Sequence, residues 1–125
     1  MTTAEVAAKL VALCRKGEFN QAMESLYGQN IVSVEAFEMP NLGREIRGLE
    51  GVRKKSQWWE ANHTVESCTV TGPFVSTERF AVVFALSGSE KSNGKKFQMT
   101  EIAVYTVADG KIVREEFLYE APPAK

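Results

Sequence analysis

Hydrophobic positions follow a helical period over the first quarter of the chain. Thr2 and Glu5 have the spacing of a capping box, in which a hydroxyl and a carboxylate satisfy two free backbone amides at a helix start. Apolar residues then recur on one face of two segments, of which Gly17 ends the first and Gly28 the second. The pattern therefore predicts two short amphipathic helices. Their apolar stripes are Val6, Leu10, Leu13 and Cys14, and Phe19, Ala22, Met23, Leu26 and Tyr27.

The period changes to two after these helices, with one interruption. Residues 31–37 are rich in β-branched side chains and predict a first strand. Residues 38–48 contain Pro40, Asn41 and Gly43 and predict a loop or lid, and residues 49 to about 63 predict a third helix. Four further strands are predicted near residues 64–71, 78–87, 96–107 and 111–119, with turns at 72–73, 88–94 and 108–110.

This order of elements indicates an α+β domain. We expect three helices to pack on one face of a curved, mainly antiparallel β-sheet. Because a twisted sheet curls, the helices should close over its concave side and form a cone with an internal pocket. A single domain is predicted over residues 1–120, followed by a tail, 121–125, whose two prolines prevent pairing in a sheet.

Two carboxylates fall on strand faces that are otherwise uncharged. Glu101 is the only charge on the row of alternate residues from 97 to 107, and Glu35 shares a row with Ile31, Ser33 and Phe37. Burial would raise the pKa of such carboxyl groups. One could then act as an ionised base while the other, protonated, donates a hydrogen bond. The alternative is that both are structural, paired with an arginine or a hydroxyl or placed at the pocket rim.

The last predicted strand does not show which of its faces points inward. One row is 113, 115, 117 and 119, and the other is 112, 114, 116 and 118. Arg114, Glu115 and Glu116 could form pairs on the outer sheet surface. Arg53, Lys54 and Lys55 make a short basic run, which we interpret as a solvated helix face.

Two adjacent tryptophans and the single histidine lie at the end of the third predicted helix. Trp58 and Trp59 diverge by about 100° on a helix, so one should form a core or pocket wall and the other a rim or dimer contact. His63 could compensate the helix dipole or shuttle protons in the pocket. Cys14, on the first apolar stripe, should be a small core residue and not a nucleophile.

Composition narrows the possible functions. The chain has 125 residues, 44% apolar and 25% charged, with a formal net charge of -1, which argues against nucleic acid as the main partner. The longest apolar run, residues 80–86, is far shorter than the roughly 20 residues that cross a bilayer, and no signal peptide is predicted. Two cysteines and one histidine offer little for a disulfide framework or a metal site. We therefore expect a cytoplasmic domain without metal, cofactor, nucleic acid or membrane partner.

Three passages resemble the SnoaL-like branch of the nuclear transport factor 2-like superfamily. They are residues 17–27 before the first strand, residues 43–53 (Gly-Arg-Glu-Ile-Arg-Gly-Leu-Glu-Gly-Val-Arg) at the entry into the third helix, and residues 105–117, which resemble the closing hairpin of the family. The resemblance covers nearly the whole chain and implies the cone fold. The superfamily includes ketosteroid isomerases, polyketide cyclases, dehydratases and epoxide hydrolases, so it implies no single reaction.

The resemblance also suggests roles for individual residues. Glu35 falls near the catalytic base of ketosteroid isomerases, Glu101 near their protonated oxyanion-hole acid, and Tyr119 near a pocket aromatic. The tyrosine that those isomerases carry in the first helix has no counterpart in residues 10–12, Leu-Val-Ala. In this superfamily the outer sheet face often forms a dimer, so we expect a homodimer through that face.

Three functions remain open at this stage. The first is a cofactor-independent isomerase, cyclase or dehydratase acting on a small apolar carbonyl compound, with Glu35 and Glu101 as catalytic residues. The second is a non-catalytic domain that binds a hydrophobic ligand in the same pocket, and the third is a dimeric accessory protein. The residues predicted to contact the ligand are Trp58, Trp59, His63, Phe84, Met99, Tyr105, Phe117 and Tyr119.

Overall fold

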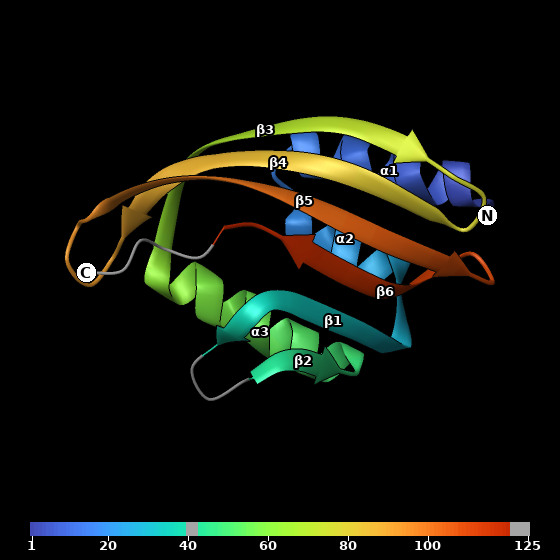
Figure 1. Ribbon diagram of the computed structural model, residues 1–125, viewed down its shortest axis with the longest axis horizontal. Coiled ribbons are helices and arrows are strands. Elements are labelled where there is room, and N and C mark those ends of the chain that lie inside the picture. The colour runs from blue at the N-terminus through green and yellow to red at the C-terminus, as the bar shows by residue number, and fades with distance from the viewer. Residues whose placement is uncertain (40–42, 121–125) are drawn as a thin grey trace.

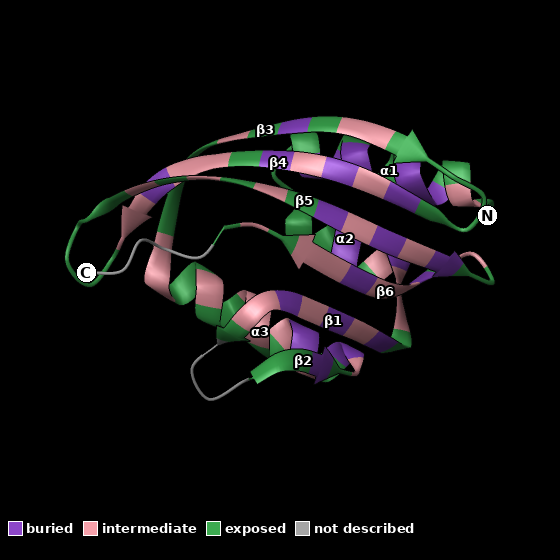
Figure 2. Ribbon diagram, in the orientation of Figure 1, coloured by how far each residue is buried: buried purple, intermediate pink, exposed green. Residues whose placement is uncertain are grey.

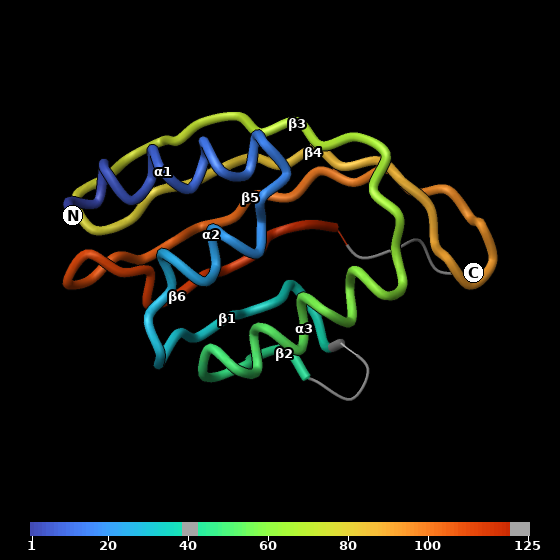
Figure 3. The backbone as a smooth tube through the Cα atoms, turned by 180° about the vertical axis from the view of Figure 1, so that it is seen from behind, coloured from blue at the N-terminus to red at the C-terminus, as the bar shows by residue number. Residues whose placement is uncertain are grey.

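Three helices cover one face of a six-stranded sheet (Figures 1 and 3). The computed structural model describes residues 1–39 and 43–120, so the predicted tail at 121–125 lies outside the described residues. In chain order the elements are α1 (Thr3–Arg15), α2 (Phe19–Leu26), β1 (Tyr27–Met39), β2 (Gly43–Arg47), α3 (Leu49–Asn62), β3 (His63–Val75), β4 (Arg79–Glu90), β5 (Lys96–Ala108) and β6 (Lys111–Leu118).

The sheet has the strand order β2-β1-β6-β5-β4-β3. All neighbouring pairs are antiparallel except β1 and β6, which run parallel although they stand near opposite ends of the sequence. The predicted α+β class, with helices on a mainly antiparallel sheet, is confirmed. The long strands β3, β4 and β5 bend together, and α3 lies across the other end of the sheet, beside β1 and β2 (Figure 1).

The predicted capping box begins α1. The Thr2 hydroxyl accepts a hydrogen bond from the Glu5 amide at 3.1 Å, and the Glu5 carboxylate accepts one from the Thr2 amide at 2.8 Å. The apolar stripe of α1 packs into the core, and Cys14 is buried within it as predicted. Burial raises the pKa of the Cys14 thiol to about 12, which makes it a poor nucleophile at neutral pH.

The prediction of a loop over residues 38–48 is wrong for most of these residues. Residues 43–47 form the edge strand β2, which pairs with β1, while residues 40–42 lie outside the described part of the chain. Only Ile46 of β2 is buried, so the strand carries no alternating apolar pattern that sequence analysis could detect. The strand β1 also begins at Tyr27, four residues before its predicted start.

Two predicted turns overlap strands: the turn at 72–73 lies wholly within β3, whereas of the turn at 88–94 only residues 88–90 belong to β4. Gly72 and Pro73 fall inside β3, where the register with β4 shifts between Thr71 and Phe74. A proline is tolerated there because β3 is an edge strand and the register shift interrupts its pairing. Gly88 stays within β4, and a side chain at this position would collide with the Thr64 carbonyl oxygen of β3. Here glycine permits the close approach of two strands.

Burial is uneven along the inner face of the sheet. Buried residues concentrate on β4 and β5 at the end covered by α1 and α2, whereas the opposite end carries mainly intermediate and exposed residues (Figure 2). On the inner row of β5, Ala103 and Tyr105 are buried while Met99 and Glu101 are only partly so. Across the described residues, no helix is long and apolar enough to cross a membrane.

Candidate active site

Three carboxylates and one lysine meet on the inner face of the sheet. Glu35 comes from β1, Glu115 from β6 and Glu101 from β5, and Lys55 reaches them from α3. Strand pairing sets their placement: Ser33 of β1 is the register partner of Glu115, and β5 is the next strand after β6. The inward direction predicted for Glu35 is thus confirmed, and Glu101 lies on the same inner face.

Glu115 is the most deeply buried of the three carboxylates, with 2% of its surface exposed. One carboxylate oxygen accepts a hydrogen bond from the Ser33 hydroxyl at 2.7 Å, and the other accepts one from the Tyr27 hydroxyl. Burial and the charge of Glu115 raise the pKa of the Tyr27 phenol, so Tyr27 remains a donor. The interpretation that Glu115 pairs on the outer sheet surface is therefore wrong, although Arg114 and Glu116 do pair there at 3.2 Å.

A register shift in β6 explains why the sequence pattern does not show which row of the last strand points inward. Val107 pairs with Ile112, but Thr106 pairs with Arg114, so β6 contains one extra residue at this point. Ile112 and Glu115 are consequently both buried, although they belong to different alternating rows. Neither of the two predicted rows describes the whole strand.

Lys55 was interpreted as part of a solvated face, and that interpretation is wrong. Its side chain is 12% exposed, and its ammonium donates to the Ser33 hydroxyl at 2.5 Å and to Glu35 at 3.1 Å. The ammonium also lies 3.7 Å from Glu115 and 4.9 Å from the centre of the Phe117 ring. The neighbouring Lys54 is exposed.

Helical spacing could have identified Lys55 as an inward residue. Positions 52, 55 and 59 share one helix face, and Val52 and Trp59 are buried or partly buried. Arg53 faces away from the site and pairs with Glu24 and Glu50.

Glu35 has a hydrogen-bond donor at each carboxylate oxygen. Lys55 contacts one oxygen, and the Tyr119 hydroxyl donates to the other at 2.9 Å. Burial and then the charge of Glu35 raise the pKa of the Tyr119 phenol, so Tyr119 stays protonated and continues to donate. The Tyr119 ring packs edge-on against Phe37 with ring centres 4.9 Å apart, which fixes its direction.

Glu101 differs from the other two carboxylates because no described residue donates a hydrogen bond to it or forms an ion pair with it. Burial, followed by the negative charge of Glu35, raises the pKa of Glu101 to about 7, with Lys55 acting in the opposite direction. The side chain is only partly buried. Glu101 is therefore the carboxyl group of the site that can exchange a proton near neutral pH.

The residues predicted to contact a ligand on the strands and at Trp59 separate into two groups. Phe84 and Tyr105 are core residues: Tyr105 stacks on Phe80 and is 3% exposed, and Phe84 packs near Phe19. Met99, Trp59, Phe117 and Tyr119 are partly buried, and Phe117 and Tyr119 contact Lys55 and Glu35 directly.

The two tryptophans diverge as helical geometry predicts. Trp58 is 39% exposed, whereas Trp59 stacks on His63 with ring centres 3.7 Å apart. The His63 Nδ1–H donates to the Trp59 carbonyl oxygen at 2.9 Å, which places the imidazole at the end of α3. This contact agrees with a helix-end role, and a proton-shuttling role for His63 stays a prediction.

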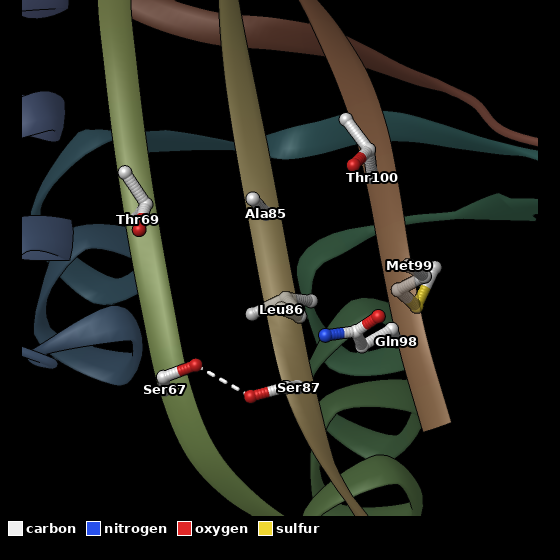
Figure 4. A pocket seen from close by; sticks show the side chains of 8 residues that line it. All are labelled: Ser67, Thr69, Ala85, Leu86, Ser87, Gln98, Met99 and Thr100. Atoms are coloured by element: carbon white, nitrogen blue, oxygen red, sulfur yellow. Dashed lines mark hydrogen bonds between the residues drawn. The ribbon is translucent and has the colours of Figure 1, made fainter.

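Two hollows described in the structure lie away from the carboxylates. The larger, about 460 Å³, opens on the outer face of β3, β4 and β5 and is lined mostly by hydroxyl and amide side chains such as Thr69, Ser87 and Gln98 (Figure 4). The second, about 440 Å³, lies beside it near Glu66 and Lys96. Neither includes Glu35 or Glu101, so an internal pocket beneath the helices stays a prediction.

Within residues 1–39 and 43–120, no three histidine, cysteine, aspartate or glutamate side chains are placed to hold a metal ion. The Lys55 ammonium lies between Glu35 and Glu115, where it supplies the positive charge that a cation would otherwise bring.

Comparison with known protein families shows the family to which the chain belongs. A family model described as the SnoaL-like domain matches residues 1–119. The chain belongs to the SnoaL-like family. No curated protein matches it.

Solved structures agree with the family assignment of this SnoaL-like protein. A protein from Mesorhizobium loti, provisionally described as a SnoaL-like polyketide cyclase, is 39% identical and superposes with a TM-score of 0.90, covering 95% of this chain and 100% of that one. An NTF2-like protein from Burkholderia thailandensis shares 20% identity and a TM-score of 0.81, covering 96% and 92%. TerC, crystallised with polyporic acid, shares 16% identity and a TM-score of 0.74, covering 94% and 90%. The last two likenesses concern the fold alone.

Proposed function

We propose that this SnoaL-like protein is a cofactor-independent acid–base enzyme that transfers protons on a small, apolar, neutral carbonyl compound. Isomerisation, cyclisation and dehydration all fit this description. The observation that carries the proposal is the contrast between two neighbouring carboxyl groups. Glu35 accepts hydrogen bonds from Lys55 and Tyr119, whereas Glu101 receives none from the described residues and has a pKa of about 7.

The two carboxyl groups can divide one proton-transfer step between them. Ionised Glu35 takes a proton from the carbon next to the substrate carbonyl, and the electrons of that C–H bond form the enol double bond. The carbonyl oxygen receives the displaced π electrons and takes the proton that Glu101 donates. Every atom and electron is accounted for by the substrate and the two side chains.

The surroundings of Glu101 suit an apolar ligand. Met99 lies two residues from Glu101 on the same row, and Phe84 is the partner of Glu101 across the strand pair. Phe117 lies on β6, and Tyr119 follows the end of that strand. The related Mesorhizobium loti protein, 39% identical, carries a polyketide cyclase description. That description supports a polyketide-like carbonyl compound as the ligand class.

Deuterium exchange tests this proposal without a known substrate. The wild-type protein is incubated in D₂O with a panel of neutral cyclic ketones and β-diketones, and NMR follows deuterium entering beside the carbonyl. Because protonated Glu101 is the donor, we expect the exchange rate to fall as pH rises through about 7.

Two results would contradict the proposal. One is an absence of exchange with every ketone of the panel. The other is saturable thermal stabilisation by steroids, polyketides or fatty acids without any exchange, which would establish a non-catalytic ligand-binding domain instead.

For the assembly, we propose a homodimer through the outer sheet face. Ile102 and Leu118 are register partners on that face and are 41% and 52% exposed, next to the Arg114–Glu116 pair. Exposed apolar side chains that lie side by side on one face favour that face as a protein interface.

Arg114→Glu tests the dimer, since it places two acidic side chains side by side on the proposed interface. We expect the dimer dissociation constant to rise at least about tenfold, measured by analytical ultracentrifugation. Lys91→Glu, in the exposed turn after β4, is the matched control and should leave it unchanged. A wild-type monomer, or a dimer that Arg114→Glu does not weaken, would contradict the proposal.

A further inference from the structure

We propose that Lys55 is a positioning residue that decides which carboxyl group of the site carries the exchangeable proton. It keeps Glu35 and Glu115 as anions and leaves the proton to Glu101. This inference rests on the proposed function only for what the proton does in catalysis. Where the proton resides does not depend on that function.

The contacts of the Lys55 ammonium are directed at two of the three carboxylates. It donates to Glu35 at 3.1 Å and lies 3.7 Å from Glu115. It also donates to the Ser33 hydroxyl, which in turn donates to the same Glu115 oxygen at 2.7 Å. Ser33 therefore joins the ammonium to Glu115 by a second route. Charge-assisted contacts of this kind favour the ionised form of both acids.

Glu101 receives no such support from the described residues. It lies on β5, one strand beyond Glu115, and its partner across the strand pair is the apolar Phe84. Three ionised carboxylates and one ammonium would give the site a charge of −2 in a poorly hydrated place. Protonation of Glu101 reduces the net charge of the site to −1. Unlike Glu35 and Glu115, Glu101 gives up no hydrogen bond or ion pair with a described residue when it binds that proton.

The other titratable groups near the site do not supply positive charge. Tyr27 and Tyr119 are phenols that donate to Glu115 and Glu35, and Cys68 of β3 lies near Glu101. The Arg44 guanidinium bonds the backbone carbonyl of Glu35 at 2.8 Å and not its carboxylate. Within the described part of the chain, Lys55 is thus the only cation that contacts a carboxylate of the site.

Carbon-13 NMR of protein labelled at the glutamate carboxyl carbons tests the proposal directly. The signals are assigned with Glu35→Gln, Glu101→Gln and Glu115→Gln. In the wild type we expect Glu101 alone of the three to titrate between pH 6 and 8. In Lys55→Gln we expect Glu35 or Glu115 also to titrate in that range, as a second proton is bound. Lys54→Gln, which removes the exposed neighbouring charge, should keep the wild-type pattern.

Rescue separates charge from packing. Lys55→Arg retains the cation and should restore the single titration of Glu101, whereas Lys55→Met fills the space without charge and should behave like Lys55→Gln. Titration of Glu35 or Glu115 near pH 7 in the wild type would overturn the proposal even if every variant unfolds. So would an unchanged pattern in folded Lys55→Gln.

The result of the carbon-13 NMR titration does not depend on whether the protein catalyses a reaction. A wild-type protein that shows the expected titration but exchanges no ketone proton would refute the proposed function and leave the role of Lys55 intact. Ketone exchange by a protein in which Glu35, and not Glu101, holds the proton would refute the role of Lys55. It would also reverse the assignment of acid and base, while leaving acid–base catalysis at this site intact.

Discussion

Glu115→Ala is expected to lower the free energy of unfolding by about 3–5 kcal/mol, the usual cost of removing one partner from a buried charge pair. The substitution leaves the Tyr27 and Ser33 hydroxyls without their acceptor and takes one of two anions from the Lys55 ammonium. It also opens a cavity, because the Glu115 side chain is only 3% exposed. Urea unfolding at pH 7, followed by circular dichroism, measures the loss.

Two controls test whether the buried network causes this loss. Glu116→Ala removes the adjacent glutamate, which lies on the outer face, and should change stability by no more than about 0.5 kcal/mol. Glu115→Gln keeps the shape and an acceptor oxygen, so it should destabilise less than Glu115→Ala. Equal stabilities for Glu115→Ala and Glu116→Ala would show that the network contributes nothing.

Glu101→Gln is expected to slow proton exchange on a ketone substrate by about 10²–10⁴-fold, because an amide cannot give up a proton to the carbonyl oxygen. The remaining activity should also lose its fall near pH 7, since the group responsible is gone. NMR measurement of deuterium incorporation across pH 5–9 provides both results. Glu116→Gln is the matched control and should keep the wild-type rate and profile.

The same variant should change how stability depends on pH. The folded protein holds the Glu101 proton up to about pH 7, whereas the unfolded chain releases it near the ordinary carboxyl value of 4.5. Wild-type stability therefore falls as pH rises between these values, and Glu101→Gln lacks this contribution. Relative to wild type, the variant should gain about 1–3 kcal/mol between pH 5 and pH 9. A difference that stays constant with pH would contradict a proton held by Glu101.

The sequence contained enough information for the fold and for part of the site. Alternation along β1 and β5 placed Glu35 and Glu101 on inner faces because each charge interrupts an otherwise uncharged row. The capping box and helical stripes placed α1 and α2 for equally local reasons. These signals depend only on neighbours a few residues apart.

The features that the sequence analysis did not predict depend on contacts between residues that lie far apart in the sequence. Glu115 turns inward because β6 contains one extra residue opposite β5, and a register shift has no local signature when both rows mix apolar and charged residues. Lys55 stood in a basic run, and its inward direction becomes evident only when Val52 and Trp59 are seen on the same helix face. Tyr27 was assigned to a helix stripe, although it begins β1 and donates to Glu115.

The parallel pairing of β1 with β6 has a consequence for synthesis on the ribosome. Residues 27–39 emerge early, but the strand that lies between them and the rest of the sheet is residues 111–118. Until that last strand leaves the exit tunnel, β1 has only the short β2 beside it, and Glu35 has neither Tyr119 nor the strand that carries Glu115. Assembly of the carboxylate cluster must therefore wait until residues 111–119 have emerged, and until then β1 keeps one unpaired edge.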